Sequence, residues 1–118
     1  MVRKLALCLF AALTSLAQVG ANAQSWPTRG VRLLVPYPPG GASDIQSRLV
    51  AGKLSERWGV PVVVENKPGG NTVIATDTVA KAAPDGHTLV LTAMPFALNP
   101  MLIAKLPYNS DRDLAPVS

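Results

Sequence analysis

Hydrophobic and polar positions along the chain alternate between a pattern typical of strands and one typical of helices. Residues 31–36, VRLLVP, form a nearly unbroken apolar run, as expected of a strand covered on both faces in a parallel sheet. Strands of similar character are expected at 60–66 and 87–93, and helical segments at 43–58 and 73–83 separate the three. This β-α-β-α-β order predicts an α/β fold with right-handed crossovers, a parallel sheet and the first strand at its centre.

The expected helix at 43–58 has a start signal, an apolar face and a stop signal. Ser43 and Gln46 have the spacing of a capping box, in which side chains bond the free N–H groups of the first turn. Gly59 stands where such a helix would end. The apolar residues expected to pack on the sheet broadly share one helical face; they are Ile45, Leu49, Val50, Leu54 and Trp58.

The remainder of the chain is less regular. The second helix carries Lys81 in its last turn and stops before the turn sequence PDG. After the third strand, MPFALNP has the character of a loop, and a short helix is expected at 101–104. A polar tail containing proline then runs to Ser118.

Glycine and proline are concentrated in the loops that follow the three strands, YPPGGASD, NKPGGNT and MPFALNP. In open α/β sheets, ligands bind beyond the carboxyl ends of the strands. Prolines fix the backbone direction, and glycines let a ligand approach the main chain. A helix that begins at Ser43 or Asp44 directs unpaired N–H groups and a partial positive charge to the same place. The first loop therefore predicts a binding site for an anion.

Local motifs for nucleotide binding and catalysis are missing from this loop region. PPGGASD lacks the lysine of a phosphate-binding P-loop, and G-x-G-x-x-G does not occur. His87 lies between a turn and a strand, and we interpret it as an exposed strand-edge residue. Asp44 either belongs to the site or only favours the helix dipole. Glu65, which closes the second strand, faces either the same crevice or, as we expect, solvent.

The first 23 residues have the pattern of an export signal. MVRK supplies positive charge, LALCLFAALTSLA an apolar core, and ANA a cleavage site after Ala23. A membrane anchor is the alternative, but polar residues from Gln18 onward interrupt the apolar stretch, and a spanning helix needs about 20 residues. Cys8 is the only cysteine and lies too near the start for a lipid-anchored cysteine. The mature chain, 24–118, would therefore carry no disulfide or thiolate chemistry.

The length and charge of the chain narrow the classes of partner. Its 118 residues correspond to at most one ordinary domain, and the net charge is +4. Removal of the leader, with Arg3 and Lys4, leaves nine basic and seven acidic residues. The basic residues form no run and are not interleaved with aromatic residues, so we expect no nucleic-acid partner.

Several motifs occur together in one order: VPYPPGG followed by Asp44, VVVENKPGG, AKAAPDG, and LPY followed by DLAPV. In this combination the chain from Trp26 to Ser118 resembles the N-terminal part of the extracytoplasmic solute receptors of tripartite tricarboxylate transporters, the Bug-type or TctC-type receptors. The resemblance implies a periplasmic-binding-protein-like fold of type II, with two α/β lobes. It further implies that 24–118 is the N-terminal part of lobe 1 and that the parallel β-α-β-α-β core is incomplete.

The resemblance also implies a function and a site. A receptor of this family binds a small carboxylate in the periplasm and presents it to the membrane subunits of a transporter; it is not an enzyme, needs no cofactor or metal, and is expected to be monomeric at full length. The loop after the first strand would bind the ligand carboxylate. The corresponding residues are Tyr37, Pro38, Gly40, Gly41, Ala42, Ser43 and Asp44, together with Ala93, Met94 and Phe96 after the third strand.

The chain departs from the family pattern at a few positions. After the second strand, the family usually has PGAGG followed by asparagine and isoleucine, whereas this chain has Gly70, Asn71 and Thr72 before Val73. The replaced glycines put the close approach of that loop to a ligand in doubt. Met94 and Phe96 are bulky at positions where the family often has small or hydroxyl residues, which suggests a less polar pocket wall.

Two functional classes remain open at this point. The leading one is a solute receptor for a carboxylated metabolite or an aromatic acid; the alternative is an exported α/β enzyme or signalling sensor that shares the lobe. An enzyme should show a paired nucleophile and base, and none is visible in these residues. We further expect that the 118 residues alone are a truncated form and not a working receptor.

Overall fold

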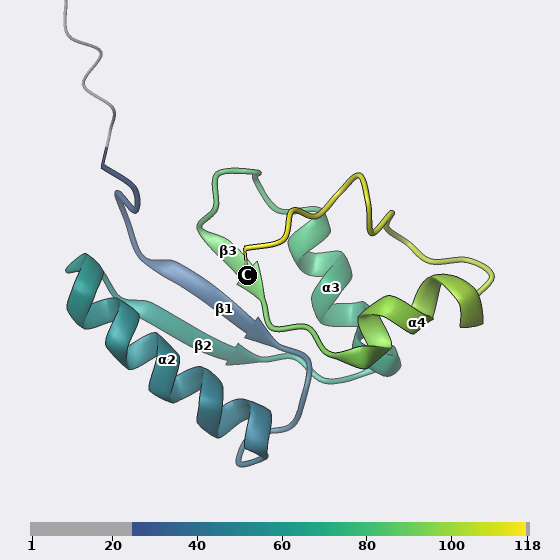
Figure 1. Cartoon of the computed structure of the whole chain (residues 1–118), viewed down its shortest axis with the longest axis horizontal. Helices are drawn as coiled ribbons and strands as arrows, with labels where there is room; N and C mark the ends of the chain where they lie inside the picture. Colours follow the sequence, from purple (N-terminus) through teal and green to yellow (C-terminus); the bar gives the residue numbers. More distant parts are fainter. Residues whose placement is uncertain (1–24, 118) are drawn as a thin grey trace, which may run out of the picture.

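A computed structural model describes residues 25–117, so the predicted export signal and its cleavage site lie outside the described residues. The described part forms a three-stranded parallel sheet in the order β2-β1-β3 (Figure 1). Its strands are β1 (Val31–Val35), β2 (Val62–Asn66) and β3 (Thr88–Val90). The predicted α/β class, the parallel pairing and the central position of the first strand are therefore confirmed.

The core of the sheet is centred on β1. Val31, Leu34 and Val35 are all fully buried, because β1 has neighbours on both edges and helices nearby. Helix α2 (Ala42–Trp58) packs on β1 and β2, and α3 (Val73–Ala80) packs on β3 and β1 (Figure 1). The crossover from β1 to β2 and the crossover from β2 to β3 run in opposite directions across the sheet, so right-handed connections place α2 and α3 on opposite faces. No helix among the described residues has both the length and the apolar character needed to cross a bilayer.

The start of α2 differs from the prediction, whereas its end agrees with it. The N-cap is Gly41 and no side chain caps the helix, so the predicted capping box of Ser43 and Gln46 is wrong. Ser43 lies inside the first turn, two residues after the cap position. At the other end, Gly59 adopts the left-handed conformation, with φ of 69°, and donates its N–H to the Ser55 carbonyl. Glycine has no Cβ to oppose this conformation.

The buried face of α2 is also different from the predicted one. Ile45, Leu49 and Val50 are 54%, 68% and 52% exposed. The buried residues are instead Asp44, Ser47 and Ala51. Small side chains allow the helix to lie close to the sheet, and the Ser47 hydroxyl satisfies its hydrogen bond inside the helix, on the Ser43 carbonyl at 2.7 Å.

The segment after β3 forms a helix where a loop was predicted. Helix α4 (Met94–Leu102) replaces both the expected loop MPFALNP and the expected short helix at 101–104. The helix contains two prolines: Pro95 lies in the first turn, where a backbone N–H has no helical partner, and Pro100 lies inside the helix. A short 3-10 turn, η1 (Gly70–Thr72), precedes α3 and packs against α4.

An aromatic cluster at the amino end of the sheet buries His87. This residue is 5% exposed, so the prediction of an exposed strand-edge histidine is wrong. The Trp26 ring lies 5.8 Å from the His87 ring and 5.0 Å from the Trp58 ring, centroid to centroid. These partners are distant in sequence, which is why local pattern did not reveal them. Glu65 forms an ion pair with Arg32 at 2.6 Å and stays partly exposed, as expected.

Candidate functional site

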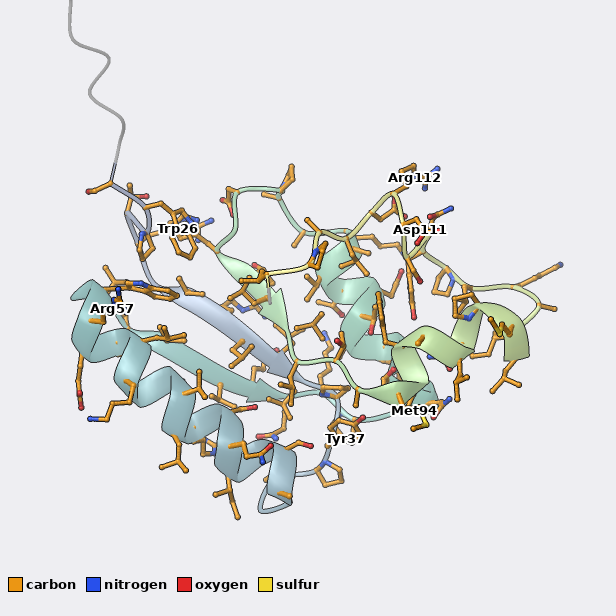
Figure 2. The ribbon with its side chains drawn as sticks, in the orientation of Figure 1. Trp26, Tyr37, Arg57, Met94, Asp111 and Arg112 are labelled. Carbon is orange, nitrogen blue, oxygen red and sulfur yellow. The ribbon has the colours of Figure 1, made fainter. Side chains whose placement is uncertain are left out.

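The loops that follow the three strands meet at the carboxyl edge of the sheet, where α2, α3 and α4 also begin (Figure 1). Parallel strands place all their carboxyl ends at one edge, so this arrangement follows from the topology. Tyr37, just after β1, and Met94, at the start of α4, both lie in this region in Figure 2. The edge therefore gathers the residues predicted to bind a ligand.

The predicted residues differ in how far they face solvent. Those that are exposed are Pro38, Gly40, Gly41, Ala42, Ala93 and Met94, those that are half-buried are Tyr37, Ser43 and Phe96, and Asp44 is buried. Phe96 also lines a groove of about 860 Å³ beside β3, so it does not belong to the carboxyl edge alone.

Asp44 anchors the first loop from inside the protein. Its Oδ2 accepts the Gly40 N–H at 2.9 Å and the Arg48 Nε–H at 3.1 Å, and its Oδ1 accepts the Asn66 amide at 2.9 Å. The hydrogen bond from Arg48, then those from Gly40 and Asn66, lower the pKa of Asp44 to about 2. With both oxygens engaged and 4% of the residue exposed, Asp44 shapes the loop and stays ionised at neutral pH.

Asn66 is a site residue that the sequence analysis did not identify. It ends β2 and donates its side-chain amide to the Tyr37 carbonyl at 3.1 Å as well as to Asp44. It also accepts a hydrogen bond from the Arg48 guanidinium at 3.0 Å. One amide thus joins the end of β2 to the loop after β1 and to the start of α2. The available signal was a polar residue closing an apolar strand directly before a glycine-rich loop.

The start of α2 keeps groups available for an anion. The N–H groups of Ala42 and Ser43 have no carbonyl four residues earlier in the helix, and no side chain caps them. A Cβ added to Gly41 would lie 3.6 Å from the Pro38 carbonyl, an ordinary contact, so the protein itself leaves space at this position. Exposed N–H groups at the positive end of a 17-residue helix suit a carboxylate.

The second loop has an unusual backbone. Gly69, Gly70, Asn71 and Thr72 have φ values of 126°, 56°, 52° and 75°. The first two are glycines, which adopt such values readily, whereas a β-branched threonine rarely does. Asn71 and Thr72 therefore adopt the kind of conformation that favours the glycines usual in the family. Within residues 25–117, no group of three or more His, Cys, Asp or Glu side chains could bind a metal ion.

Comparisons with known proteins agree on one family. Residues 46–118 match the family model described as "Tripartite tricarboxylate transporter family receptor". The chain is 42% identical over 99 residues to protein BugT of Bordetella pertussis, an alignment that covers 82% of this chain and 30% of BugT.

Solved structures of similar proteins show the same arrangement of elements. The periplasmic binding protein BugD superposes with a TM-score of 0.73 at 35% identity, over 78% of this chain and 31% of BugD. MatC from Rhodopseudomonas palustris, solved with bound malate, superposes with a TM-score of 0.71 at 36% identity, over 78% of this chain and 32% of MatC. The chain thus spans roughly a third of the length of these relatives.

Proposed function

Because the chain belongs to the tripartite tricarboxylate transporter receptor family, we propose that it forms the N-terminal part of lobe 1 of a periplasmic receptor for a small carboxylate. The receptor would deliver this ligand to the membrane subunits of a transporter. The observation that carries the proposal is the uncapped start of α2, held beside an open glycine loop by the buried Asp44. The malate bound to MatC supports the same ligand class.

The alternative of an exported enzyme is not supported. The matched proteins are solute-binding receptors, which confirms the expectation of a binding protein and not an enzyme. A signalling sensor would share the site and differ only in its partner, so the transporter subunits are part of the proposal.

The proposed contacts follow from the geometry of the carboxyl edge. A ligand carboxylate would accept hydrogen bonds from the N–H groups of Ala42 and Ser43 and from the Ser43 hydroxyl. Tyr37, together with the start of α4 at Met94, would flank the remainder of the ligand. Asp44 would act indirectly, because its oxygens hold the loop and are not directed at the ligand.

The second lobe and the remaining strands of lobe 1 are also part of the proposal. Among residues 25–117, β3 has a neighbouring strand on one side only, and the groove beside it is lined by Leu89, Leu91 and Phe96 among others. An open strand edge next to apolar side chains is suited to pairing with further chain. We therefore expect residues 24–118, expressed alone, to show no cooperative thermal unfolding whose midpoint temperature rises when malate is added. Such unfolding would show that the half-site binds malate by itself.

Isothermal titration of the protein expressed from its complete gene tests the function. A panel of di- and tricarboxylates that includes malate should contain a ligand that binds without turnover. Ser43→Ala should weaken that binding by about 1–3 kcal/mol, since it removes a direct hydrogen bond to a charged group.

Ser47→Ala is the matched control, one turn further along α2, because its hydroxyl bonds the Ser43 carbonyl inside the helix. Its affinity should equal that of the parent. Formation of a product, or unchanged binding in Ser43→Ala, would contradict the proposed role of this loop.

A further inference from the structure

Two asparagine side chains, of which Asn99 is buried and Asn71 exposed, join the second loop to α4. The Asn71 side chain donates to Asn99 Oδ1 at 2.7 Å, and the Asn99 side chain donates to the Asn71 carbonyl at 2.9 Å. Asn99 is fully buried in α4. A buried amide is costly unless its groups are paired, so this reciprocal pairing is needed for α4 to lie where it does.

The partner of Asn99 is the segment with the left-handed backbone. Asn71 and Thr72, with φ of 52° and 75°, lie directly before α3, and Thr72 is 5% exposed. Such conformations persist where the surroundings hold them. Asn99 contacts this segment at the Asn71 carbonyl and, at a longer 3.5 Å, at the Thr72 hydroxyl.

Helix α4 contacts η1 at Asn99. Of the described helices and strands, η1 is the one against which α4 chiefly packs, while α4 reaches the sheet only through the short stretch after β3. The outer side of α4 is open, since Leu98 is 41% and Met101 84% exposed. Asn99 supplies the side-chain hydrogen bonds that join α4 to η1.

We propose that Asn99 is a positioning residue for the carboxylate site. It joins the loop after β2 to α4, so that these two segments form one mechanical unit, here called the joint rim, which keeps the start of α4 at the ligand. The role of Asn99 in affinity rests on the proposed function, whereas the joining of the loop after β2 to α4 does not. The proposal assigns a role in affinity to a side chain that is fully buried and lies outside the predicted contact residues.

Two variants separate positioning from simple stability. Asn99→Ala leaves the Asn71 carbonyl and amide without partners. Asn71→Gly removes only the 2.7 Å bond, keeps the carbonyl that Asn99 uses, and suits the positive φ, so it should fold well. Ser55→Ala is the matched control, since the Ser55 hydroxyl accepts the Val62 N–H at 2.8 Å near the start of β2, away from the carboxyl edge.

Hydrogen exchange and titration with malate, both on the protein from its complete gene, give independent readouts. We expect Asn99→Ala to speed amide exchange in both 69–73 and 94–98 and to weaken malate binding roughly 2- to 30-fold. Asn71→Gly should have a smaller effect of the same kind. Ser55→Ala should lower the melting temperature but leave malate affinity and exchange at the carboxyl edge unchanged.

The possible results are distinguishable. Unchanged amide exchange at 69–73 or at 94–98 in Asn99→Ala would overturn the proposed joint rim, regardless of the result of the titration. Faster exchange with unaltered malate affinity would overturn the role in binding and leave the receptor function intact. If the parent protein does not bind malate, the titration uses a member of the carboxylate panel that does bind. If no carboxylate binds, the receptor function and the role of Asn99 in affinity are both wrong, and the exchange data then test only whether the loop after β2 and α4 are joined.

Discussion

The two ends of the sheet are each organised around an aspartate, but only one end leaves polar groups open to a ligand. At the carboxyl end, Asp44 is buried and bonds the first loop, Asn66 and Arg48. At the amino end, Asp85 is 41% exposed at its side chain; it accepts the His87 N–H at 2.9 Å and pairs with Arg29 at 2.7 Å. The pKa of each carboxyl is lowered to about 2.

Aromatic rings complete the amino end. The Trp26 indole donates to the Asp85 carbonyl at 3.1 Å, and its ring lies between those of Trp58 and His87. At the carboxyl end, the corresponding place beside Asp44 is occupied by the exposed loop at Gly40 and Gly41. The difference indicates that one anchor stabilises the fold and the other shapes a surface for binding.

The largest expected effect on carboxylate binding is that of replacing Asp44, compared with replacing Asp85 in a separate variant. Asp44→Ala leaves the Gly40 N–H and one of the two N–H groups of the Asn66 amide without an acceptor, so the loop loses its shape and carboxylate binding should fall below detection. Asp85→Ala should lower the melting temperature and leave affinity within about twofold, because the carboxyl edge is untouched. Titration calorimetry on variants shown to be folded by circular dichroism measures both. Equal losses of binding would remove the distinction between the ends.

A smaller effect is expected from bulk placed at the open loop. Gly41→Val should fold, since a Cβ at this position meets only the Pro38 carbonyl at 3.6 Å and φ is −77°. It should nevertheless weaken carboxylate binding by about 3 kcal/mol, the upper end of ordinary overpacking costs, and by more than Ser43→Ala does. Gly52→Val, in open space further along α2, is the control. Parent-like affinity of Gly41→Val would show that the ligand does not approach this glycine.

The contrast between the ends also shows what the sequence could predict. The strand order and the end of α2 followed from local signals, namely apolar runs and Gly59. The clustering of the three loops followed from parallel topology. The role of Asp44 could not be decided, because its partner Asn66 is 22 residues away and joins it only after β1 and β2 have paired.

Tertiary contacts likewise explain the errors. Leu49 was expected to be buried, but α2 turns its small residues to the sheet and leaves Leu49 68% exposed. His87 was expected to be exposed, but Trp26, from the start of the described chain, covers it. The proline-containing α4 was expected to be a loop, because the hydrogen bonds between the buried Asn99 and Asn71 have no local signal.

The smallest expected effect is a difference in how the two aspartates respond to acid and salt. Both carboxyls have a pKa of about 2 against an ordinary 3.8. A carboxyl with a lowered pKa in the folded state stabilises the protein above about pH 4, and this stabilisation is lost as the pH falls toward 2. Both ends should therefore weaken together in acid at low salt, which a series of thermal unfolding curves would record.

Salt should separate them. Asp85 pairs with Arg29, whose side chain is 61% exposed, so dissolved ions screen that attraction, while its bond from the His87 N–H persists. Asp44 also pairs with a half-exposed arginine, Arg48, but its own side chain is only 5% exposed and accepts the Gly40 N–H and the Asn66 amide as well, so dissolved ions should screen it less. Carboxyl NMR titrations in low and high salt should thus show the pKa of Asp85 moving further toward its ordinary value than the pKa of Asp44, both starting from about 2. Equal movement would mean that solvent reaches Asp44, and the carboxyl end would then lack the buried anchor on which its open loop depends.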